Sequence, residues 1–170
     1  MEIKLSGVVN DSIVDGPGIR FTVFTQGCQH NCPGCHNPQT HDSQGGFIGD
    51  TDLILKALAE NPLLDGVTLS GGEPFLQPLS CLHIAEGAKK LGLNVWAYTG
   101  YLWEALLDTK NPNILALLKQ IDVLVDGPFL MEQRSLNLLF CGSRNQRLID
   151  VKKSFEAKTV ILWETETAYE

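Results

Sequence analysis

Three cysteines lie within eight residues of one another, and this group constrains the chain more than any other feature. The segment from Gly27 to His36 reads GCQHNCPGCH, so Cys28, Cys32 and Cys35 form a CxxxCxxC pattern. Its glycines and proline disfavour helix and strand, and we expect a loop. Because thiolates hold iron–sulfur clusters, the loop predicts a site where three cysteines bind three irons of a [4Fe–4S] cluster. The fourth iron is then open to a substrate, like the open position of a catalytic zinc.

Zinc is the main alternative for this loop. Structural zinc sites usually take four ligands, often from two CxxC pairs, and the chain has no second CxxC. A fourth ligand would have to be His30, His36, Cys81 or Cys141. A disulfide framework is disfavoured, because five cysteines is an odd number and nothing in the sequence indicates secretion.

Length and composition describe an ordinary globular chain. With 170 residues, 44% of them hydrophobic and 19% charged, we expect a single domain spanning residues 1–170. A net charge of −7 disfavours nucleic acid as a partner, since phosphate binding needs clustered Lys and Arg. The N-terminal residues lack the apolar core of a signal peptide, and no apolar run reaches the roughly 18 residues of a membrane span. We therefore expect a cytoplasmic protein without a membrane partner.

Hydrophobic patterns predict strands that alternate with helices. Strands are expected at residues 3–9, 21–26, 66–70, 93–98 and 121–126, and helices at 51–60, 78–91, 101–108 and 113–120. Two further strands are expected at 136–140 and 157–163. This alternation favours a parallel α/β sheet with right-handed crossovers. A complete α/β barrel needs about 250 residues, so the expected fold class is a partial, open α/β barrel with parallel strands.

A glycine-rich turn follows one of these strands. Gly71-Gly72-Glu73-Pro74 comes directly after residues 66–70, while Thr99 and Asp126 follow the next two parallel strands. Because active sites of α/β barrels lie at the carboxyl ends of the strands, we expect these residues to lie near the cysteine loop. Glycines let the backbone approach a ligand, and a carboxylate accepts hydrogen bonds from an ammonium group.

In this order, the motifs resemble the radical S-adenosylmethionine (SAM) enzymes, whose leading motifs are CxxxCxxC and GGEP. The run Asp15-Gly16-Pro17-Gly18-Ile19-Arg20, together with CPGCHNP from Cys32 to Pro38, resembles the activating enzymes of glycyl-radical enzymes. Residues 123–129 and 142–147 are similar to activators of anaerobic ribonucleotide reductase. The resemblance runs from about residue 3 to residue 151, nearly the whole chain.

The resemblance implies an iron–sulfur oxidoreductase with a radical SAM fold. In such enzymes SAM binds the open iron through its amine and carboxylate. An electron from the cluster then cleaves SAM to methionine and a 5′-deoxyadenosyl radical. The implied partner is anaerobic ribonucleotide reductase, on which this radical generates a glycyl radical. Reduced flavodoxin or ferredoxin is the implied electron donor.

The resemblance also implies roles for individual residues. Gly71-Gly72-Glu73-Pro74 would hold the methionine end of SAM, with Glu73 accepting from its amine. His36 would stack on the adenine, and Thr99 and Asp126 would lie near the ribose and carboxylate. Arg144 belongs to a polar cluster able to meet the SAM carboxylate. No catalytic residue is expected beyond the cluster ligands.

Two other interpretations stay open at this point. The chain is alternatively an activator of another glycyl-radical enzyme, such as pyruvate formate-lyase. A different class is a non-catalytic iron–sulfur or zinc module that serves electron transfer or scaffolding. Such a module needs neither GGEP nor an open iron, so these two features favour the enzyme.

Overall fold

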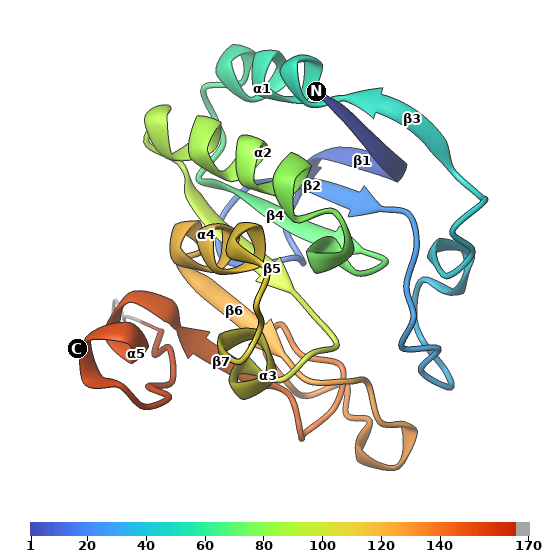
Figure 1. Ribbon diagram of the computed structural model, residues 1–170, viewed down its shortest axis with the longest axis vertical. Coiled ribbons are helices and arrows are strands. Elements are labelled where there is room, and N and C mark those ends of the chain that lie inside the picture. Colours follow the sequence, from blue (N-terminus) through green and yellow to red (C-terminus); the bar gives the residue numbers. More distant parts are fainter. Residues whose placement is uncertain (166–170) are drawn as a thin grey trace.

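The computed structural model describes residues 1–165 and is organised around one seven-stranded sheet (Figure 1). The strands lie in the order β3-β1-β2-β4-β5-β6-β7. Their bounds are Glu2–Ser12 (β1), Arg20–Thr25 (β2), Phe47–Asp50 (β3), Gly66–Gly71 (β4), Asn94–Tyr98 (β5), Val123–Asp126 (β6) and Arg147–Asp150 (β7).

Four neighbouring strands, β2, β4, β5 and β6, run parallel, whereas β1, β3 and β7 pair with their neighbours antiparallel. The α-helices are Thr51–Glu60 (α1), Pro78–Lys90 (α2), Trp103–Leu107 (α3), Pro112–Gln120 (α4) and Val151–Ala157 (α5). Short 3-10 helices occupy Pro38–Thr40 (η1), Pro74–Leu76 (η2) and Met131–Gln133 (η3). The expected α/β sheet with parallel strands is confirmed as a mixed sheet. The curvature of a partial barrel stays a prediction.

Helices α1, α2 and α4 cover one face of the sheet (Figure 1). Apolar side chains at alternate strand positions point to these helices, as a buried sheet face requires. This core includes Phe21, Val23, Val67, Leu69, Val95, Ala97 and Leu124 from the strands, and Ile54, Leu58, Ile84, Ala85, Leu117 and Leu118 from the helices. Among residues 1–165, no helix has the length and apolar character that crossing a membrane requires.

Loops rather than helices cover part of the opposite face. Trp96 on this face packs against the rings of Phe140 and Trp163, which come from segments near the C-terminal end of the described chain. The fully buried Arg20 donates hydrogen bonds to Thr68 Oγ1 at 2.7 Å and to the carbonyl oxygen of Pro17 at 3.1 Å. Arg20 thereby holds the turn between β1 and β2 against the sheet.

The C-terminal third of the chain departs most from the sequence-based expectations. Residues 136–140 form turns and bends, so the expected strand is wrong there. The strand expected at 157–163 is also wrong: residues 151–157 form α5, and Leu162 makes only an isolated bridge to Ile149. Helix α5 forms because the side chain of Asp150 caps it by accepting from the backbone N–H of Lys153.

The N-terminal strand is longer than expected, because β1 extends to Ser12. The unpredicted strand β3 pairs along its outer side and forms the edge of the sheet. β3 has four residues, and Phe47 and Ile48 in it are both exposed, so it lacks the alternation that would predict a strand.

Candidate functional site

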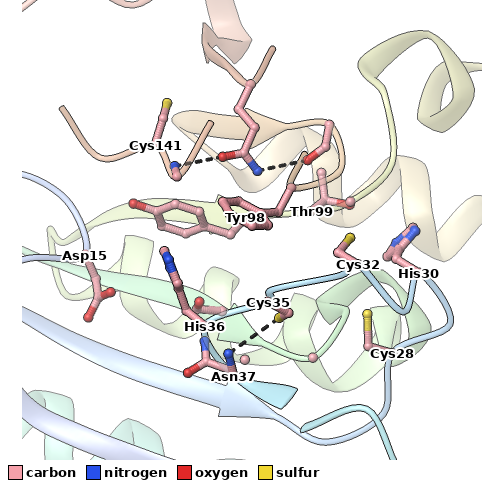
Figure 2. Close-up of a pocket in the computed structure, with 18 of the residues that line it drawn as sticks. Asp15, Cys28, His30, Cys32, Cys35, His36, Asn37, Tyr98, Thr99 and Cys141 are labelled. Atoms are coloured by element: carbon pink, nitrogen blue, oxygen red, sulfur yellow. Dashed lines mark hydrogen bonds between the residues drawn. The ribbon is translucent and has the colours of Figure 1, made fainter. Parts of the chain in front are cut away.

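A cavity of about 410 Å³ opens where the parallel strands end (Figure 2). Cys28 follows β2, Ser70 and Gly71 end β4, Tyr98 ends β5, and Gly127 follows β6. The volume is typical of a site for a small ligand. This is the end of the sheet at which sequence analysis placed the site.

All three cysteines of the CxxxCxxC pattern line this cavity. Each is half-buried, and all five cysteines of the chain are free thiols. The segment is the expected loop, with Asn31 and Gly34 in the left-handed region at φ of 47° and 75°. Burial raises the pKa of the Cys28 thiol above its ordinary value, while a hydrogen bond from the backbone N–H of His30 acts in the opposite direction.

The thiols fit a cluster that spans several irons. Within residues 1–165, no three His, Cys, Asp or Glu side chains are grouped to hold a single metal ion. The thiolates of a [4Fe–4S] cluster bind different irons, so they do not need to meet at one ion position. Three free thiols that share one cavity wall provide the required donor set.

The glycine turn after β4 packs directly against the start of the cysteine loop. The backbone N–H of Glu73 donates to the carbonyl oxygen of Gly27 at 2.8 Å. A Cβ added at Gly72 would lie 2.3 Å from that same oxygen, so this position accepts only glycine without movement of the backbone. Gly71 and Gly72 both line the cavity, as expected.

Glu73 does not line the cavity but lies beneath its wall, with 1% of its surface exposed. Its carboxylate accepts hydrogen bonds from Thr99 Oγ1 at 2.9 and 3.0 Å, from the N–H of Gly100 at 2.8 Å and from the N–H of Phe75 at 3.2 Å. Nε2 of His30 lies 2.7 Å from the same carboxylate. Both oxygens are therefore engaged by the protein, and the predicted direct contact with an amine does not match this position.

Asp126 and Arg144 do not line the cavity. Asp126 is fully buried and forms a two-point ion pair with Arg147, with distances of 3.0 and 2.5 Å, while also accepting from the N–H of Trp103 at 2.9 Å. The hydrogen bonds to Asp126 and then to Glu104 raise the pKa of Arg147. The structure thus assigns Asp126 to an ion pair rather than to the cavity wall. Arg144 is exposed and does not line the cavity.

Of the remaining expected residues, two line the cavity and one is buried in the protein. His36 and Thr99 line the cavity, and the His36 ring lies 5.3 Å from the ring of Phe129. Pro74 is buried at the start of η2 and is not part of the wall.

Sequence reasoning missed several lining residues. Figure 2 shows Asp15 and Tyr98 toward the end of the cavity away from Cys28, and Cys141 also lines the cavity. Burial raises the pKa of the Tyr98 hydroxyl, and the charge of Asp15 adds to this effect. Strand alternation in β5 would have found Tyr98, because it shares a sheet face with Trp96, opposite the helices.

The fold and the site define an α/β protein with three free cysteines on the wall of one cavity at the strand ends. A sequence model of the family described as "4Fe-4S single cluster domain" matches residues 14–149. The anaerobic ribonucleoside-triphosphate reductase-activating protein of Escherichia coli K12 is 35% identical over 143 residues, covering 79% of this chain and 90% of its own length. The chain therefore belongs to the 4Fe-4S single cluster domain family and groups with these activating proteins.

Other relatives carry the same name. The activating proteins of Haemophilus influenzae and Enterobacteria phage T4 are each 34% identical, and each match covers 79% of this chain. These matches cover 89% and 86% of the two relatives. Among solved structures, QueE from Escherichia coli aligns with a TM-score of 0.46 and 15% identity, over 59% of this chain and 53% of QueE. That likeness is too remote to bear on function.

Proposed function

We propose that this protein is a radical SAM activase that generates a glycyl radical on anaerobic ribonucleotide reductase. The observation that carries the proposal is the set of three free thiols facing a cavity at the strand ends. The relatives that cover most of the chain are named as activating proteins of this reductase. When bound, the reduced cluster supplies the electron that cleaves SAM to methionine and a 5′-deoxyadenosyl radical, which takes a hydrogen atom from a glycine of the partner.

Different parts of the cavity wall hold the cluster, the amino-acid end of SAM and the adenine. Cys28, Cys32 and Cys35 hold three irons of the cluster. Next to them, the backbone of Gly71 and Gly72 forms a surface without side chains, against which the amino-acid end of SAM fits. The rings of His36 and Phe129 form an aromatic wall for the adenine.

Residues at the distant end of the cavity leave room for a segment of the partner protein. Asp15 and Tyr98 line this end, and the turn that carries Asp15 is held in place by Arg20 through Pro17. Because a radical is lost when it meets solvent or other groups, the partner's glycine must enter the cavity itself. We further propose one radical SAM domain for the whole chain, with the curvature of a partial barrel, a cytoplasmic location and reduced flavodoxin or ferredoxin as electron donor.

The test is an anaerobic assay with the protein, SAM, a reductant and the purified reductase of the same organism. We expect about four irons per chain with matching sulfide, and an EPR doublet of a glycyl radical on the reductase. Deuterium placed at the Cα of the partner's glycine is expected in 5′-deoxyadenosine. One zinc per chain and no sulfide would overturn the proposal. Transfer of the label from pyruvate formate-lyase, and never from the reductase, would overturn the choice of partner.

A further inference from the structure

His30 lies between the first two cysteines of the loop, yet its side chain reaches across to the turn after β4. Its Nε2 is 2.7 Å from Oε2 of Glu73, and the two side chains are only 17% and 1% exposed. Figure 2 shows His30 at the end of the cavity where Cys28 and Cys32 lie. A hydrogen bond between a partly buried histidine and a fully buried glutamate on different segments thus connects the loop to the turn after β4.

The surroundings of the His30 ring fix its place on two further sides. The ring of Tyr101 packs edge-on against it, with centroids 4.6 Å apart. A Cβ added at Gly100 would lie 2.4 Å from Cδ2 of His30, so the space occupied by the imidazole depends on glycine at that position. The ring is therefore packed against Tyr101 and Gly100 while it is hydrogen-bonded to Glu73.

The other end of the connection reaches a cluster ligand. His30 is two residues from Cys28 in the loop. On the other side of Cys28, the carbonyl oxygen of Gly27 accepts a hydrogen bond from the backbone N–H of Glu73 at 2.8 Å. Glu73, in turn, is held by Thr99 and Gly100 at the end of β5. Glu73 thus connects the ends of two parallel strands to the cysteine loop on both sides of Cys28, through Gly27 and through His30.

We propose that His30 and Glu73 are a positioning pair that holds Cys28 and the start of the cysteine loop in place for the cluster. The proposal rests on the proposed function only in requiring that the loop bind an iron–sulfur cluster. Neither residue binds iron. Partners that orient the ligands of a metal site typically change its affinity by about 10- to 100-fold when they are replaced. Hydrogen bonding and solvent exposure around a cluster tune its reduction potential, so a displaced cysteine loop has a spectroscopic consequence.

The experiment compares His30→Ala, His30→Gln and Glu73→Gln with the wild-type protein after anaerobic reconstitution. The readouts are iron and sulfide per chain, the rate of iron loss to a chelator, and the EPR spectrum and reduction potential of the reduced cluster. His83→Ala is the matched control, because His83 also bonds a side chain, Thr51 Oγ1 at 2.7 Å, but lies on α2 and does not line the cavity.

We expect iron loss to be about 10- to 100-fold faster in His30→Ala and in Glu73→Gln, with a shifted reduction potential. His30→Gln should lose iron more slowly than His30→Ala, because the glutamine amide N–H can still donate to Glu73. The control should match the wild type. Wild-type retention and an unchanged EPR spectrum in His30→Ala would overturn the inference, and a His30→Gln variant as impaired as His30→Ala would do the same. A wild-type protein that assembles no cluster would instead overturn the proposed function.

Discussion

The ion pair between Asp126 and Arg147 provides a quantitative test of the packing around the site. Asp126 has no exposed surface, whereas the Arg147 side chain is 31% exposed and also contacts Glu104. Replacing Arg147 with Leu leaves a buried carboxylate with only the N–H of Trp103 as a donor. Removal of one partner from a buried pair costs about 3–5 kcal/mol, and the partial exposure of Arg147 places this case near 3 kcal/mol.

The opposite change is expected to cost less. In Asp126→Asn, Arg147 keeps its ion pair with Glu104 and its contact with water. The amide oxygen of the new side chain can still accept from the N–H of Trp103. The expected loss in the free energy of unfolding is therefore about 1–2 kcal/mol. Glu104→Gln is the matched control, because that side chain is 60% exposed and such surface pairs contribute about 0–1 kcal/mol.

Urea unfolding of all variants under identical anaerobic, reducing conditions measures these differences through the transition midpoints. The double variant Asp126→Asn with Arg147→Leu is expected to be more stable than Arg147→Leu alone, because no buried charge is left without a partner. The reasoning is refuted if Asp126→Asn costs more than Arg147→Leu, or if the double variant is the least stable of the set.

Two further predictions concern the cysteine loop. Replacing any one of its three cysteines with Ala should abolish cluster binding, measured as iron and sulfide, because the loop has no spare thiol. Cys81→Ala and Cys141→Ala should retain both; an iron-free Cys81→Ala variant would contradict the ligand assignment. Gly100→Ala should speed iron loss to a chelator, because its Cβ would lie 2.4 Å from the His30 ring. Gly7→Ala, whose Cβ meets nothing within 4 Å, is the control, and equal rates in the two variants would argue against this reasoning.

Helices whose ends are set by neighbouring residues, such as a capping side chain or a proline, could be predicted from the sequence. Helix α1 begins and ends where expected, because Asp50 caps it and Asn61-Pro62 stops it. The parallel strands followed from their apolar runs. Strands β3 and β7 could not be predicted, because each has only two apolar residues, next to one another, and so shows neither an apolar run nor alternation.

The same distinction applies to the site. The cysteines could be identified because their spacing is a local pattern. The surroundings of Glu73 could not, because its hydrogen-bond donors Thr99 and Gly100 are 26 and 27 residues away. The ion pair of Asp126 could not be predicted for the same reason, since its partner Arg147 lies 21 residues downstream. The residue types and their spacing therefore indicated the chemistry of the site. Which side chains face the cavity depends on long-range contacts that form only in the folded sheet.

A group of aromatic side chains packed edge-on beside the cavity supplies an intrinsic fluorescence signal near the site. Trp96 is 2% exposed and packs edge-on against Trp163 at 4.9 Å and Phe140 at 5.3 Å, and Phe140 lines the cavity. Iron–sulfur clusters absorb in the near-ultraviolet range in which indoles emit, so a cluster bound in this cavity is expected to quench part of the emission of the three tryptophans. Loading and loss of the cluster can therefore be followed in an unlabelled sample, in real time, from intrinsic fluorescence.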